Sequence, residues 1–150
     1  MSETDIQKLH KADIAERQID TAIELFLERK DYLSIITLAG AGEEILGNLL
    51  ERNKETNMFS HLIDLDIRLS NGGRPYNVVN QEINGFRNSL KHAKLPEEDI
   101  IDVTESQEQA IAMLSRVLVN YYAYKKKLSQ KMYEFYEWLK VNRPELFPSD

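Results

Sequence analysis

The sequence predicts an all-α protein, an up-and-down bundle of about five helices. The four prolines stand at positions 75, 96, 144 and 148, so residues 1 to 74 and 97 to 143 lack the residue that most disrupts helices. Apolar residues recur at three- and four-residue steps along most of the chain, which is the spacing of one helical face. The best strand signal, Ile100 to Val103, is one short run, and an isolated run cannot make a sheet.

Two helices are expected in the N-terminal third of the chain. The first lies between Asp5 and Lys30, where apolar residues from Ile6 to Leu27 mostly keep the helical spacing. Asp31 can cap the second, which runs to about Glu55. The apolar face of this second helix is formed by Ile35, Leu38, Ala39, Gly42, Ile45, Leu46 and Leu49. Glycines at 40, 42 and 47 each cost about 1 kcal/mol inside a helix, so another helix is expected to approach closely there.

Turn and capping residues indicate where the remaining helices begin and end. A shorter helical piece, Met58 to Leu69, leads into the densest turn signal of the chain, Ser70 to Pro75. Asn77 then opens a helix that is expected to run to about Lys94 with an amide-rich polar face. Thr104 to Gln107 has the pattern of a capping box for the next helix. That helix carries Ala110, Leu114, Val117 and Tyr121, and a final one, ending near Asn142, carries Met132, Tyr133, Phe135, Tyr136 and Leu139.

Length and composition indicate one soluble, cytoplasmic domain over residues 1–150. The chain has no cysteine, which excludes disulfides, thiolate nucleophiles, thiolate zinc sites and iron–sulfur clusters and fits a reducing compartment. Its longest uncharged apolar stretch, Tyr32 to Gly42, is far short of the ~20 residues that span a bilayer, and Glu3 and Asp5 argue against a signal peptide. We therefore expect no membrane partner.

The charge balance and the spacing of motifs argue against several further functional classes of protein. Nineteen basic residues against twenty-five acidic ones argue against a protein that coats nucleic acid through bulk charge, and no DNA partner is expected. No histidine follows a glutamate at the Glu-x-x-His spacing of di-iron bundles. The zinc-protease, dinucleotide-binding and P-loop motifs are missing, as is the Gly-x-Ser-x-Gly elbow. Neither a metal nor a cofactor is expected.

The strongest chemical signal is the run Arg87-Asn88-Ser89-Leu90-Lys91-His92, the one place where an arginine stands five residues before a histidine. Cleaving RNA without a metal requires a base for the 2′-hydroxyl, an acid for the leaving 5′-oxygen and a cation for the developing phosphorane charge. Histidine suits the first two roles and arginine the third. On an ideal helix Arg87 and His92 are about 140° and about 7.5 Å apart, so they flank a groove that a second chain can complete. The alternative is that both side chains are solvated on a polar helix face.

The same run resembles the Arg-x(4 to 6)-His motif of the HEPN superfamily (higher eukaryotes and prokaryotes nucleotide-binding domains), in which a polar residue such as Asn88 follows the arginine. The stretch Leu38-Ala-Gly-Ala-Gly-Glu-Glu-Ile-Leu-Gly47 is also similar to small bacterial proteins of this type. Members of the superfamily are small helical bundles, commonly homodimers, and many with this motif are metal-independent endoribonucleases. The resemblance implies that Arg87 and His92 are catalytic and that Asn88 supports them.

Basic and amide side chains near the motif are candidate binding residues. Residues 83–94 hold three basic residues and no acid, and residues 116–131 hold five basic residues and no acid, with three tyrosines interleaved. Lysines contact phosphates, and tyrosines stack on unpaired bases. The candidates are Asn84, Lys91, Lys94, Tyr122 and Lys125. The alternative is structural, because Tyr121 continues an apolar stripe and lysines near a helix C-terminus complement the helix dipole.

Glu43 is expected to face inward as a supporting residue. On a helical wheel it falls beside Ile36 and Leu50, whereas Glu44 falls on the polar side. A carboxylate at the edge of an apolar face requires a partner, and Arg87 or Lys91 is the expected one. The alternative is a glutamate that reaches solvent at the edge of the helix.

The sequence thus favours a homodimeric endoribonuclease of the toxin or defence type that acts on single-stranded RNA. The homodimer follows from the chemistry, because a motif with one histidine cannot supply both acid and base in one step. The alternative is a non-catalytic HEPN binding module whose partner is a nucleotide or a protein, such as a nucleotidyltransferase-type antitoxin.

Overall fold

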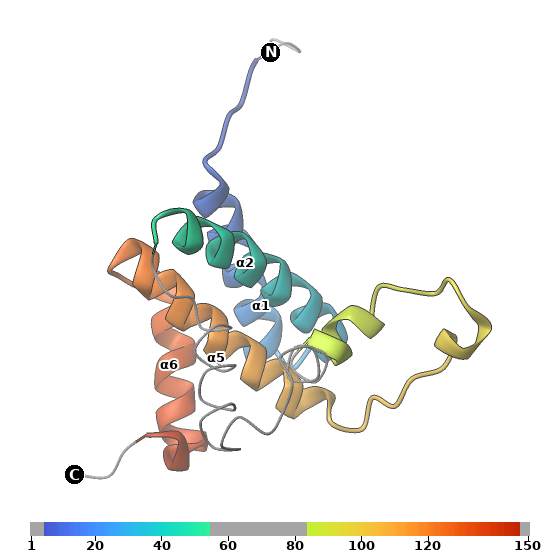
Figure 1. Ribbon diagram of the computed structural model, residues 1–150. Helices are drawn as coiled ribbons and strands as arrows, with labels where there is room; N and C mark the ends of the chain where they lie inside the picture. Colours follow the sequence, from blue (N-terminus) through green and yellow to red (C-terminus); the bar gives the residue numbers. More distant parts are fainter. Residues whose placement is uncertain (1–4, 55–83, 148–150) are drawn as a thin grey trace, which may run out of the picture.

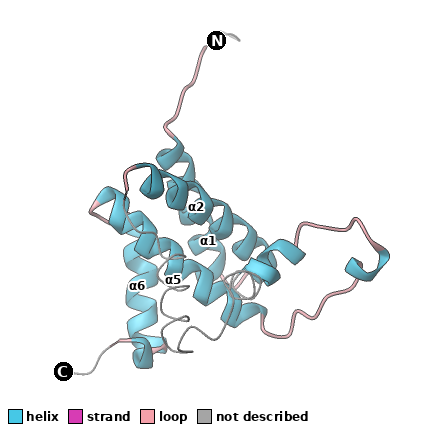
Figure 2. Cartoon of the chain, in the orientation of Figure 1, coloured by secondary structure: helices cyan, strands magenta, loops and turns pink. Residues whose placement is uncertain are grey.

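A computed structural model describes residues 5–54 and 84–147, and these residues form an all-α bundle without a strand (Figures 1 and 2). The long helices are α1 (Lys11–Leu27), α2 (Tyr32–Arg52), α5 (Ser106–Lys125) and α6 (Gln130–Asn142). Residues 84–89 are also helical, and Pro96–Glu98 and Pro144–Leu146 form single turns of 3₁₀-helix. The expected helix Met58 to Leu69, the turn Ser70 to Pro75 and the helix start at Asn77 lie outside the described residues.

Helix α1 begins later than the sequence predicts. The N–H of Ala12 donates to Nδ1 of His10 at 3.0 Å, so His10 is the N-cap. Ile6 and Leu9, which the periodicity assigned to the helix, are 81% and 47% exposed. Because they contact no core, nothing favours helix formation before His10.

Helix α2 is the centre of the bundle and packs mainly on α1 and α5. Asp31 caps it as predicted, accepting from the N–H of Ser34 at 3.1 Å, and the helix ends at Arg52. The predicted close approach at two of its glycines is confirmed. A Cβ at Gly42 would lie 2.9 Å from Cγ1 of Ile19 in α1, and one at Gly40 would lie 2.5 Å from Cδ of Arg87.

By length and composition alone α2 could also cross a membrane, but more than half of its apolar window is buried inside the protein. Its buried residues join those of the other three long helices in one hydrophobic core. Such burial is typical of the central helix of a bundle.

Helix α6 packs against α1 through an aromatic cluster. Phe26 meets Trp138 edge to face with ring centroids 4.8 Å apart, and it meets Phe135 in the same way at 5.4 Å. Ser129, the N-cap of α6, donates to Asp20 of α1 at 2.7 Å. The predicted core face of α6 is confirmed for Met132, Phe135 and Leu139, whereas Tyr133 and Tyr136 are exposed.

The helix that carries the motif ends earlier than predicted. Its last helical residue is Ser89 rather than Lys94, and two turn-type hydrogen bonds follow, from Leu90 to Arg87 and from Lys91 to Asn88. Leu90, just beyond the helix, is the last residue here that packs on the core, and the residues from Lys91 to Lys94 are exposed. A longer helix would bury no further apolar surface.

A long, mostly exposed connector leads from the motif to α5. Ile100 to Val103 form no strand. The capping-box prediction at Thr104 is wrong, because the backbone N–H of Thr104 donates to Asp102 at 2.9 Å and its hydroxyl bonds the same carboxylate. Helix α5 therefore starts at Ser106 without a side-chain cap. Its predicted core residues Ala110, Leu114, Val117 and Tyr121 are all buried.

Candidate functional site

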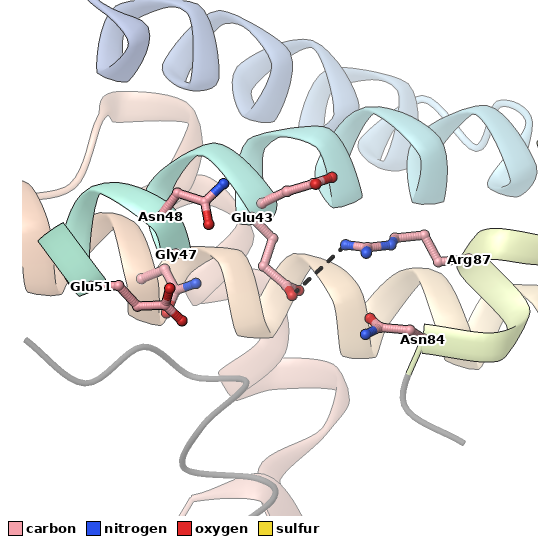
Figure 3. Close-up of a pocket in the computed structure, with 8 residues that line it drawn as sticks. Glu43, Gly47, Asn48, Glu51, Asn84 and Arg87 are labelled. Carbon is pink, nitrogen blue, oxygen red and sulfur yellow. Dashed lines mark ion pairs between the residues drawn. The ribbon is translucent and has the colours of Figure 1, made fainter. Parts of the chain in front are cut away.

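The centre of the candidate site is Glu43, a carboxylate buried in the middle of α2. Its side chain is 5% exposed, and its Oε1 accepts a hydrogen bond at 2.7 Å from Nη2 of Arg116 on α5. Nη1 of Arg87 lies 4.0 Å from the same oxygen (Figure 3). The prediction that Glu43 faces inward and is paired with a cation is thus confirmed. Arg87 is the more distant of its two partners, and Lys91, the other expected partner, is exposed.

Burial and the neighbouring positive charges shift the pKa of the Glu43 carboxylate in opposite directions. Burial raises the pKa of Glu43 above its usual value, and the attraction of Arg116 and Arg87 only partly offsets that rise. Burial likewise lowers the pKa of the Arg116 guanidinium, against the pull of Glu43. Two guanidinium groups therefore lie beside one carboxylate that burial disfavours as an anion.

Arg87 is the cation that keeps most of its donors uncommitted. Its side chain is 15% exposed and crosses α2 at Gly40, where Nη1 donates to the carbonyl oxygen of Gly40 at 3.3 Å. Its Nε donates to no atom of the described residues. A guanidinium carries five N–H donors in a planar fork, so this arrangement leaves donors for an incoming anion.

A pocket of about 130 Å³ opens beside Arg87 between α2 and helical residues 84–89. Figure 3 shows Asn48 and Glu51 along α2, with Asn84 and Arg87 facing them across the pocket. The full lining is Glu43, Glu44, Gly47, Asn48, Glu51, Asn84, Arg87 and Asn120. The sequence-predicted residues Arg87, Asn84 and Glu43 are therefore brought together at one site.

His92 is placed differently from Arg87. It is exposed and lies three residues beyond the helix end, so the ideal-helix separation expected for the pair does not apply. No hydrogen bond joins the two side chains within the described ranges 5–54 and 84–147. Asn88 is half-buried on the last turn of the helix. One chain alone thus presents a fixed arginine and an exposed histidine.

The second cationic segment does not join the first. Lys91 and Lys94 are exposed next to the motif, but Tyr122 and Lys125 lie at the C-terminal end of α5, away from helical residues 84–89 (Figure 1). Tyr122 is 56% exposed and lines an apolar groove with Leu118, Val119, Leu128 and Tyr136. Lys125 lies 4.0 Å from Asp13.

Sequence reasoning missed two buried polar residues of α5, Arg116 and Asn120. Each stands immediately before a core residue, Val117 and Tyr121, and is itself buried. A cation and an amide four residues apart beside an apolar stripe are the signal that could have identified Arg116 as the partner of a buried carboxylate and Asn120 as a buried residue of the pocket lining.

In comparisons with known proteins, no family model, no curated protein and no solved structure matches this chain.

Proposed function

We propose that this protein is a HEPN-type, metal-independent endoribonuclease that acts as a homodimer in the cytoplasm. The observation that supports it most is the placement of Arg87, which is held at the pocket beside the carbonyl oxygen of Gly40 and the buried carboxylate of Glu43. A fixed arginine with uncommitted donors suits the charge that develops on phosphorus during RNA cleavage.

The remaining roles belong to His92 and Asn88. An exposed imidazole has access to substrate, and a second copy of the chain would bring a second His92. One histidine would then take the proton of the 2′-hydroxyl while the other protonates the leaving 5′-oxygen. Asn88, next to Arg87 on the helix, would support the phosphate, and the exposed Lys91 and Lys94 would hold the flanking RNA backbone.

A second candidate function is favoured by the placement of His92. Because Arg87 contacts Gly40 and Glu43 while His92 is exposed beyond the helix end, the pocket can also serve a non-catalytic module. Such a module would bind a nucleotide phosphate or a carboxylate on a protein partner, for example a nucleotidyltransferase-type antitoxin.

Cleavage of single-stranded RNA in EDTA separates the two functions. We expect wild-type protein to cleave, and His92→Ala to lower the rate by ~10²–10⁴ with the fold intact, because His92 supports no core contact. Arg87→Ala should lower the cleavage rate by a similar factor. Arg87→Lys should restore only part of that rate, because an ammonium group lacks the two-pronged fork of a guanidinium. A 2′-deoxyribose at the scissile position should abolish cleavage, because no nucleophile remains.

Arg17→Ala serves as the matched control, since Arg17 is exposed on α1 and lines no described pocket. Its rate should equal that of the wild type. Cleavage that persists unchanged in His92→Ala, or that is missing in wild type across varied RNAs, would favour the binding module instead.

A further inference from the structure

The α2 side of the pocket carries hydrogen-bond acceptors that the described residues leave unused. Oε2 of Glu43 is buried and accepts no hydrogen bond from any described residue. Glu44 and Asn48 stand one turn apart on α2 and line the same pocket. Both are exposed, and neither side chain pairs with another described residue. A buried carboxylate oxygen without a donor is costly, so the pocket favours a ligand that brings N–H groups to α2.

The opposite side of the pocket is cationic. Arg87 faces α2 across the pocket, and its side chain is 15% exposed (Figure 3). Its fork matches the oxygens of a phosphate. A ligand that satisfies both sides must therefore combine an anionic group with a face rich in N–H donors.

The size of the pocket excludes a single water as its sole occupant. One water requires only about 10–15 Å³ of such space, whereas this pocket offers about 130 Å³. Several heavy atoms of one planar group can enter between α2 and helical residues 84–89.

We infer that this pocket takes a nucleobase with an exocyclic amino group, adenine, cytosine or guanine, from a ribonucleotide whose phosphate contacts Arg87. The inference rests on the proposed ribonuclease function and names its base preference. Amino groups donate to carboxylate and amide oxygens, the pairing by which Glu and Asn side chains distinguish bases. Uracil presents two carbonyl oxygens around its one N–H, and these would face the carboxylates of Glu43 and Glu44.

The test is to titrate the full-length protein with AMP, CMP, GMP, UMP and inorganic phosphate. The affinity for each is measured from the shifts of backbone amide signals in NMR spectra. We expect at least one amino-bearing nucleotide to bind about tenfold more tightly than UMP, the difference that one charge-assisted hydrogen bond provides. Arg87→Ala should weaken all four nucleotides. Glu44→Gln should reduce the base preference and strengthen UMP binding, because it removes a carboxylate that faces the uracil carbonyl oxygens, and Asn48→Ala should weaken the amino-bearing nucleotides.

Two matched controls lie on α6, far from the pocket lining. Glu134→Gln and Asn142→Ala are exposed substitutions of the same types, and both should keep the wild-type preference. Equal affinity for all four nucleotides, no nucleotide binding, or a preference unchanged in the Glu44→Gln, Asn48→Ala double variant would overturn the base pocket.

The outcomes also separate this inference from the proposed function. RNA cleavage without base preference in binding would leave the ribonuclease standing and overturn the base pocket. Base-selective binding without cleavage of any RNA would support the base pocket and overturn the ribonuclease.

Discussion

Glu43 is the residue that connects the core of the protein to its candidate site. It contacts Arg116 at 2.7 Å on one side and lies 4.0 Å from Arg87 on the other, with its side chain buried in the bundle. Removing one partner of a buried ion pair leaves an uncompensated charge and typically costs about 3–5 kcal/mol. The same carboxylate therefore holds α2 to α5 and fixes where Arg87 can lie.

The titration of Glu43 gives a prediction on stability. Burial raises its pKa in the folded protein above the ordinary value of 4.5, so the folded state binds this proton more tightly than the unfolded state. The stabilising contribution is then complete below the unfolded pKa and is lost as pH rises through the folded pKa. We expect the free energy of unfolding of wild type, relative to Glu43→Gln, to fall as pH rises from 4.5 toward neutral.

Urea unfolding of both proteins over that pH range measures this difference. Because the Glu43→Gln variant has no titratable group at this position, subtracting its values cancels the contributions of the other acidic groups. A difference that grows with pH would show that the two arginines outweigh burial at Glu43, and a flat difference would show that they balance it; either result would contradict the prediction.

The glycines of α2 determine how closely its neighbours can lie. A Cβ at Gly42 would meet Ile19, which is fully buried, and the backbone oxygen of Ala15 at 3.4 Å. We expect Gly42→Ala to lower the free energy of unfolding by about 1–3 kcal/mol, because overpacking exceeds the gain in helix propensity. Gly85 is the control, since a Cβ there meets nothing within 4 Å. Gly85→Ala should be neutral or stabilise the protein by up to ~1 kcal/mol in thermal or urea unfolding.

A substitution at Gly40 is expected to change RNA cleavage rather than the stability of the fold. The atoms that its Cβ would displace belong to the flexible stem of Arg87. Gly40→Ala should therefore move the guanidinium from its place beside Glu43 and lower RNA cleavage at least about tenfold, since a misplaced catalytic group loses most of its effect. Stability should change by less than about 1 kcal/mol. Full activity in Gly40→Ala would show that the position of Arg87 is unimportant.

The proposed chemistry requires two copies of the chain. His92 is the one histidine of the motif, so acid and base must come from two copies. We expect a dimer by light scattering at tens of micromolar. When wild type is mixed and re-equilibrated with an equal amount of His92→Ala, random pairing leaves about a quarter of the dimers with two histidines.

The activity of that mixture distinguishes a shared site from two independent ones. The rate per total protein should fall to about a quarter of the wild-type rate if both histidines act in one site, and to about half if each chain acts alone. If light scattering shows only monomer, the hypothesis of a site shared by two chains is wrong.

The helical class and most of the core follow from the amino-acid sequence alone. Local rules suffice for these features, because apolar spacing, the Asp31 cap and the absence of proline act within one segment. They predicted α2, the buried faces of α5 and α6 and the inward direction of Glu43, all of which the structure confirms. Sequence also singled out Arg87 and His92 as a pair by their types and spacing.

Which residues meet, and where the helices end, depends on how the helices pack together. Arg116 became the main partner of Glu43 although 73 positions separate them, a contact that no local pattern encodes. The motif helix ends at Ser89 and α1 starts at Lys11 because, apart from Leu90, the residues beyond find no core to bury against. Periodicity predicts which face a helix would bury, but only the packing of the other helices decides how far that burial, and therefore the helix, extends.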